Sequence, residues 1–136
     1  MRVKFNLSKE EVPTVNGYIY PKGFWDKIFS SENVKEQLAK KCLFVYADFE
    51  PELDLTKTVA VVEEYNSEDN SVSAEILDTP CARALKDHLS SMKVSPCIYG
   101  TITCDENGIE SVDLDSAELI KLCIMEKENS DHGTCN

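Results

Sequence analysis

Two side chains of nucleophilic type lie two residues apart in an apolar, β-prone stretch, with a proline between them. Ser95 and Cys97 flank Pro96 within residues 92–102. Such a hydroxyl or thiol becomes a nucleophile when a neighbouring base, often an imidazole, takes its proton. His88 precedes this stretch by only a few residues, so a Cys97–His88 pair is one candidate for chemistry. The alternative is a strand with Ser95 at an edge or bulge and Cys97 packed inward.

Four carboxylates alternate around Pro51 and suggest a second kind of site. Carboxylate oxygens are hard ligands, which calcium and magnesium prefer. No glycine lies where a calcium-binding loop needs its sharp turn. A solvated acidic loop is therefore favoured, and no metal is expected at Asp48, Glu50, Glu52 and Asp54.

The six cysteines lack the close spacing of a zinc site. There is no CxxC pair and no CxxH cluster, so neither a structural metal nor a cofactor is expected. Five of the thiols are interpreted as small buried hydrophobic groups in a reducing compartment, and the last as a free thiol in a polar tail. The cysteines are Cys42, Cys81, Cys97, Cys104, Cys123 and Cys135.

The charge balance limits the partners. Fourteen Lys and Arg residues against 25 Asp and Glu residues give a net charge of −11. Such a chain repels phosphate backbones and anionic lipids, so neither direct nucleic-acid binding nor membrane binding is expected. Residues 1–11 lack the apolar core of a signal peptide, so the protein is not expected to be secreted. A solvated acidic surface is favoured, with DNA mimicry or a partner with a basic surface as the alternative.

The hydrophobic periodicity predicts an α+β fold: a mostly antiparallel sheet or small β-barrel flanked by two or three short helices. Residues 1–126 are expected to form a single domain and residues 127–136 a polar, flexible tail. Residues 109–125 fit either a strand or a helix. Helices are predicted over residues 22–31, 31–41 and 79–92, and strands over residues 1–7, 18–21, 42–49, 58–66, 71–78 and 93–104.

An aromatic segment with few acids precedes the second predicted helix. Its helical spacing favours a place in the core, but any exposed part of it would be the best docking surface for a protein partner, because aromatic anchors dominate interface energetics. The residues assigned to this partner-binding role are Tyr18, Tyr20, Phe24 and Trp25.

Three stretches carry a resemblance to a known family. They are NGYIYPKGFWDKI (residues 16–28), AEILDTPCARALKDHLSS (residues 74–91) and KVSPCIYGTITCDENGIESVDLDSAELI (residues 93–120). Their order and spacing resemble those of the prohead maturation proteases of tailed bacteriophages. The resemblance implies a β-barrel of the herpesvirus-protease type flanked by helices, with Ser95 aligned to the catalytic serine.

The catalytic motifs depart from the family pattern. Glu50 precedes Pro51 where the family has a histidine, and a carboxylate with a pKa near 4.3 is a poor base at neutral pH. Pro96 follows Ser95 and has no N–H to offer an oxyanion hole. Two elements of a serine-peptidase mechanism are therefore missing from the motifs.

These departures favour a non-catalytic bacteriophage protein that acts by binding another protein. It would be a virion or capsid-assembly component or an anti-defence factor, located in the host cytoplasm or the virion. The alternative is a diverged maturation protease, a serine or cysteine peptidase. If the chain is an enzyme, the candidate residues are Ser95, Cys97, His88 and Glu50.

Overall fold

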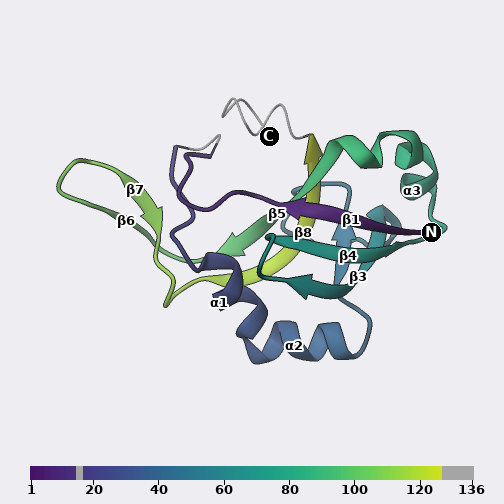
Figure 1. The fold of residues 1–136 in the computed structure, drawn as a ribbon, viewed down its shortest axis with the longest axis horizontal. Helices are drawn as coiled ribbons and strands as arrows, with labels where there is room; N and C mark the ends of the chain where they lie inside the picture. Colours follow the sequence, from purple (N-terminus) through teal and green to yellow (C-terminus); the bar gives the residue numbers. More distant parts are fainter. Residues whose placement is uncertain (15–16, 127–136) are drawn as a thin grey trace.

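Six strands close into a barrel in the order β1-β4-β3-β2-β8-β5 (Figure 1). The computed structural model describes residues 1–14 and 17–126. The pairs β1–β5 and β2–β8 are parallel and the other four pairs are antiparallel, so the predicted α+β class with a small barrel is confirmed. The barrel strands are β1 (Arg2–Leu7), β2 (Phe44–Tyr46), β3 (Thr58–Asn66), β4 (Ser71–Ile76), β5 (Met92–Tyr99) and β8 (Glu118–Glu126).

The hairpin of β3 and β4 shows why these segments form strands. Along β4, Val72 and Ala74 are fully buried, while Ser73 and Glu75 between and after them lie on the other side of the sheet. This period of two is the spacing of a half-buried strand. Asn70 adopts a φ of 53°, which a turn residue such as Asn tolerates, and so allows the tight reversal between the two strands.

Three short helices flank the barrel: α1 (Phe24–Ser30), α2 (Glu32–Ala39) and α3 (Pro80–Leu85). Ser31 separates α1 from α2, and its hydroxyl accepts a hydrogen bond from Val34 N at 3.4 Å. Thr79 caps α3 in the same way through Ala82 N at 3.1 Å. The helix predicted over residues 79–92 is shorter than expected, because it gives way to a 3₁₀ turn, η2 (Lys86–Ser91).

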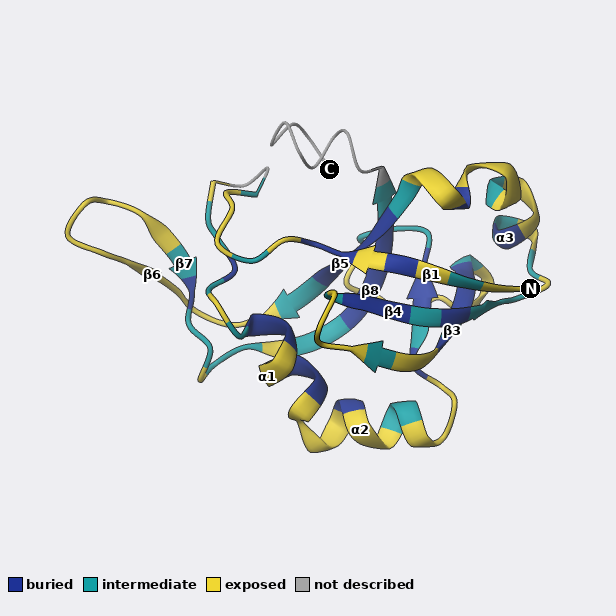
Figure 2. Cartoon of the chain, in the orientation of Figure 1, coloured by how far each residue is buried: buried dark blue, intermediate teal, exposed yellow. Residues whose placement is uncertain are grey.

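The aromatic segment lies in the core. Phe24 and Trp25 have no exposed surface, and Tyr20 is 6% exposed and stacks on Phe24 with a centroid separation of 4.6 Å. Figure 2 shows part of α1 in the colour of buried residues. Phe29 stacks in turn on Tyr65 of β3 at 4.1 Å. The burial supports the core interpretation of these rings.

A docking role for this segment would have to use its other side chains. Phe24, Trp25 and Tyr20 are closed off from solvent, so their rings are not available to a partner in this structure. Tyr18 is half-buried, and Lys22 and Lys27 are exposed.

Residues 109–125, which fitted either a strand or a helix, form two strands joined by a turn. Glu118–Glu126 form β8, with Leu122 and Ile124 in the hydrophobic core, so the helical alternative is wrong for this segment. The first part becomes β7 (Glu110–Val112), which pairs with β6 (Ile102–Cys104) in a separate two-stranded sheet. This arm, residues 100–113, extends away from the barrel (Figure 1).

The expectation of five buried cysteines is wrong. Only Cys123 is buried among the described cysteines, and Cys42 and Cys104 are exposed. Cys42 follows α2 in a connecting segment, and Cys104 lies in β6, whose residues are all exposed. The predicted tail over residues 127–136, with Cys135, lies outside the described residues.

Within the described ranges, no helix has the length and apolar character to cross a membrane.

Candidate functional site

Ser95 lies inside the protein, in the middle of β5. It is 5% exposed, and its Oγ is hydrogen-bonded to Ser8 Oγ and donates to Met125 Sδ at 3.2 Å. Ser8 directly follows β1, and the parallel pairing of Leu7 with Val94 brings it beside Ser95. The neighbours that β1 and β8 supply to this hydroxyl are therefore another hydroxyl and a thioether.

His88 is exposed on the 3₁₀ turn η2, several residues before β5 begins. The described hydrogen bonds of Ser95 and Cys97 do not involve its imidazole. The structure thus does not join the candidate Cys97–His88 pair through a hydrogen bond. His132, the second histidine, lies outside the described residues.

Cys97 is half-buried and its Sγ donates to the carbonyl oxygen of Phe49 at 3.8 Å. Burial raises the pKa of this thiol, and the positive charge of Lys121 opposes that effect only in part. The thiol is therefore protonated at neutral pH, which is the less nucleophilic form. The contact with Phe49 brings the segment after β2 beside the strand of Cys97. Glu50, which follows Phe49, is exposed and does not lie in a buried site.

A buried ammonium group that the motifs do not predict lies beside this strand. Only 1% of the Lys121 side chain is exposed, although it lies in the middle of β8 opposite Cys97. Its Nζ lies 2.6 Å from Asp48 Oδ1 and donates to Glu52 O at 3.1 Å. The same group lies 4.8 Å from the centroid of the Tyr46 ring, in cation–π geometry.

Asp48 is the centre of this charged cluster. Its second oxygen, Oδ2, lies 2.9 Å from Lys57 Nζ. Hydrogen bonds from Lys121 and then Lys57 lower the pKa of the Asp48 carboxyl below its ordinary value. One signal could have revealed the cluster: Lys121 interrupts the apolar run LIKLCIM, and a lysine inside such a strand needs an acidic partner.

The cluster holds two segments of the chain together and is not suited to binding a cation. Two ammonium groups already neutralise Asp48, so it has little negative charge left for a metal. Among residues 1–14 and 17–126, no group of three or more His, Cys, Asp or Glu side chains could hold a metal ion. The pairing fixes the segment after β2 against β8.

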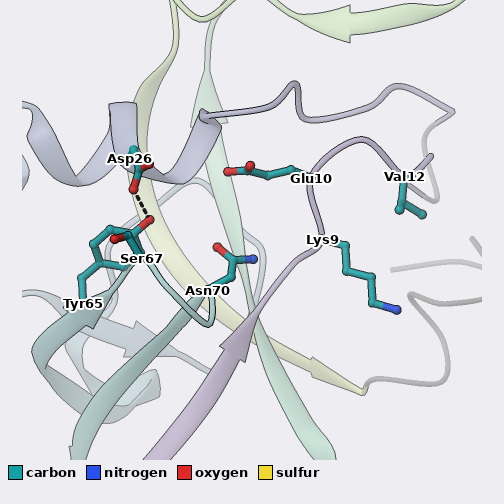
Figure 3. A pocket seen from close by; sticks show the side chains of 7 residues that line it. All are labelled: Lys9, Glu10, Val12, Asp26, Tyr65, Ser67 and Asn70. Atoms are coloured by element: carbon teal, nitrogen blue, oxygen red, sulfur yellow. Dashed lines mark hydrogen bonds between the residues drawn. The ribbon is translucent and has the colours of Figure 1, made fainter.

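A polar cleft of about 310 Å³ opens elsewhere, beside the start of α1 (Figure 3). Glu10 lies in its wall and accepts hydrogen bonds from Gly23 N and Trp25 N, both at 3.0 Å. On the opposite wall, the Tyr65 hydroxyl donates to Asp26 Oδ1 at 2.7 Å. The two carboxylates that line the cleft, Glu10 and Asp26, thus contribute to holding α1 in place. The lining residues are Lys9, Glu10, Val12, Asp26, Tyr65, Ser67 and Asn70, which include none of the candidate catalytic residues.

Comparison with known proteins supports the fold. No protein-family model and no curated protein matches the chain. Among solved structures, the capsid assembly protease gp21 of bacteriophage T4 is similar, with a TM-score of 0.67 over 90% of this chain and 80% of that one. The two share 17% sequence identity, a level at which the likeness concerns the fold. The protein therefore has a prohead-protease-like fold, as its motifs predict.

Proposed function

We propose that the chain is a non-catalytic bacteriophage protein that keeps the barrel of a capsid assembly protease and acts by binding another protein. The observation that carries this proposal is the environment of Ser95. Its hydroxyl lies between Ser8 Oγ and Met125 Sδ, on the strand where the family resemblance places the nucleophile. Neither neighbour can accept a proton as a general base does at neutral pH.

The chemistry of β5 supports the same proposal. Pro96 provides no N–H next to Ser95, and an oxyanion hole depends on donors of this kind. Cys97 has a raised pKa and an uncharged carbonyl as its hydrogen-bond acceptor. With neither a base nor an oxyanion donor beside Ser95, the barrel would serve as a scaffold for binding. The acidic surface suits a basic protein partner.

The second candidate function is a diverged maturation protease. The fold of the T4 capsid assembly protease favours it, because 90% of the chain follows that fold. Its nucleophile would be Ser95 or Cys97. A maturation protease would act in capsid assembly, whereas the non-catalytic protein would be a virion or capsid-assembly component or an anti-defence factor that binds a host protein.

Intact-mass spectrometry separates the two candidates. The purified chain is incubated alone and with capsid and scaffold proteins from the same phage, beside Ser95→Ala and Cys97→Ala variants. We expect no defined cleavage in any sample. Cleavage at fixed positions that disappears in either variant would establish the protease instead.

Affinity capture tests the binding function. Tagged protein is recovered from infected cells and from purified virions, and each captured protein is purified and mixed with the chain again. We expect direct, stoichiometric binding of one phage or host protein that survives moderate salt. Failure of every purified candidate to bind the chain directly would contradict the proposal.

A further inference from the structure

The arm formed by β6 and β7 is fixed in place at its base. Ile19 pairs with the outer edge of β7, donating from its N to Glu110 O at 2.9 Å and accepting from Val112 N at 3.0 Å. Thr101 N donates to Ser116 Oγ at 2.9 Å on the other side of the base. The arm therefore presents its remaining edge in a defined orientation, which lowers the entropy lost on binding.

The outer edge of β6 is unpaired. On either side of β6, Asp113 N donates to Thr101 O at 2.8 Å and Asp105 N donates to Ile109 O at 3.0 Å, so within β6 it is Thr103 that bonds to β7. In an antiparallel pair the intervening residues point their N–H and C=O groups away. These are Ile102 and Cys104, and no described residue hydrogen-bonds to their backbone groups.

The arm exposes several apolar side chains, and all of its charged side chains are acidic. Ile102 is 40% exposed, Ile109 is 50% exposed, and Tyr99 at the base is 73% exposed. Residues 94–120 contain no Lys or Arg, and their acids are Asp105, Glu106, Glu110, Asp113, Asp115 and Glu118. Natural edge strands are commonly protected by lysine or proline, and β6 has neither.

We propose that the outer edge of β6 binds an extended, basic segment of a protein partner by strand addition. This inference rests on the proposed protein-binding function and names its surface. The backbone groups of Ile102 and Cys104 would pair with the segment, and its lysines or arginines would face the acids of the arm. A second copy of this chain is the poorer occupant, because two acidic arms placed edge to edge repel each other.

A synthetic peptide of alternating lysine and valine is the probe for this edge. Its binding to the full chain is followed by fluorescence anisotropy and by amide hydrogen exchange. We expect slower exchange at the amides of Ile102 and Cys104, with that of Thr103 unchanged because it already faces β7. A peptide of alternating glutamate and valine should not bind.

A third peptide separates strand addition from general attraction between opposite charges. It has the lysine–valine sequence with methyl groups on alternate backbone nitrogens, which removes the donors of its bonding edge. Affinity should fall about tenfold, since several backbone hydrogen bonds are lost. Equal affinity of the methylated peptide, or unchanged exchange at Ile102 and Cys104, would overturn the inference.

The matched protein variants are Ile102→Pro and Ile102→Thr. Proline removes the outward N–H without removing a hydrogen bond to β7, whereas threonine keeps that N–H and a β-branched side chain. Amide exchange of Asp105 and Asp113 verifies that the arm stays formed. Ile102→Pro should weaken peptide binding about tenfold and Ile102→Thr less than about twofold.

The outcomes distinguish this inference from the function on which it rests. If Ile102→Pro still binds the captured partner with full affinity, the role of the arm is overturned and the binding function stands. If the wild-type chain binds the peptide at Ile102 and Cys104 but no phage or host protein, the binding function fails and the strand-addition site stands. Dimers of the wild-type chain that Ile102→Pro abolishes would show a second copy as the occupant and overturn the inference.

Discussion

Lys121 Nζ lies 2.6 Å from Asp48 Oδ1, and this contact joins the middle of β8 to the segment that follows β2. The two partners differ in their surroundings: 1% of the Lys121 side chain is exposed, against 23% for Asp48. Loss of one partner of a buried pair costs more than the pair itself contributes, because the remaining charge stays away from water. The more deeply buried Lys121 should therefore suffer more when it is left alone.

Replacement of Asp48 by alanine should lower the free energy of unfolding by about 3 kcal/mol, since it leaves the Lys121 ammonium group without its carboxylate. Lys121→Met should cost less, because Asp48 keeps Lys57 and is partly hydrated. Urea denaturation measures both changes. Glu68→Ala, at an exposed position in the β3–β4 turn, is the control and should leave stability unchanged. A larger loss in Lys121→Met than in Asp48→Ala would contradict this asymmetry.

The pair of Asp48 and Lys121 predicts that the stability of the fold depends on pH in the acid range. The pKa of Asp48 is lowered in the folded state, so below the ordinary Asp value of about 4 the unfolded chain binds a proton that the folded chain does not. This contribution is fully present above that pH and is lost as pH falls through the folded pKa. Asp48→Asn should therefore flatten the fall of melting temperature below about pH 4, relative to Asp115→Asn. Parallel curves for the two variants would count against the pair.

Trp25 should act as a core residue. Its ring is fully buried and its Nε1 donates to Ser8 O at 2.8 Å. Trp25→Ala should cost about 3–5 kcal/mol of stability, as large-to-small core substitutions do. Trp25→Phe keeps most of the ring volume but loses the hydrogen bond, so it should cost clearly less. Thermal melts by circular dichroism measure both, and a fully stable Trp25→Ala would contradict the core role.

Ser8 and Ser95 should be energetically coupled. Each hydroxyl is buried, and each loses a partner when the other is removed. Ser8→Ala and Ser95→Ala should each cost about 1 kcal/mol, and the double variant should cost less than the two together. The check is a double-mutant cycle from denaturant unfolding. Strict additivity would show that the two hydroxyls do not depend on each other.

The thiols should react in the order of their exposure. Cys42 and Cys104 are exposed and should be labelled first, followed by the half-buried Cys97. Cys123 should be labelled last, because it is buried and burial raises its pKa to about 12. Timed alkylation followed by peptide mass spectrometry gives the order under native conditions. Rapid modification of Cys123 would show that β8 opens readily.

Local sequence patterns were enough to predict much of the fold. The alternation in residues 2–7 and 71–76, the β-branched run in residues 58–66 and the cap at Thr79 depend on near neighbours, so the sequence shows them directly. The contacts of Ser95 with Ser8 and of Lys121 with Asp48 depend on how the barrel closes, through the parallel pairs β1–β5 and β2–β8. Those pairs join segments far apart in the chain, and no local pattern specifies their register.

Closure of the barrel also governs how the chain can fold as it is synthesised. The first strand pairs with β4 on one side and with β5 on the other, and Asn6 lies opposite both Ser71 and Lys93. During synthesis β1 leaves the ribosome before both of its partners, so its two edges stay unpaired until β4 and then β5 have followed. Such long-range closure carries a large loop entropy cost and makes folding slow. During that interval β1 is the segment that a chaperone would most need to shield from pairing with other chains.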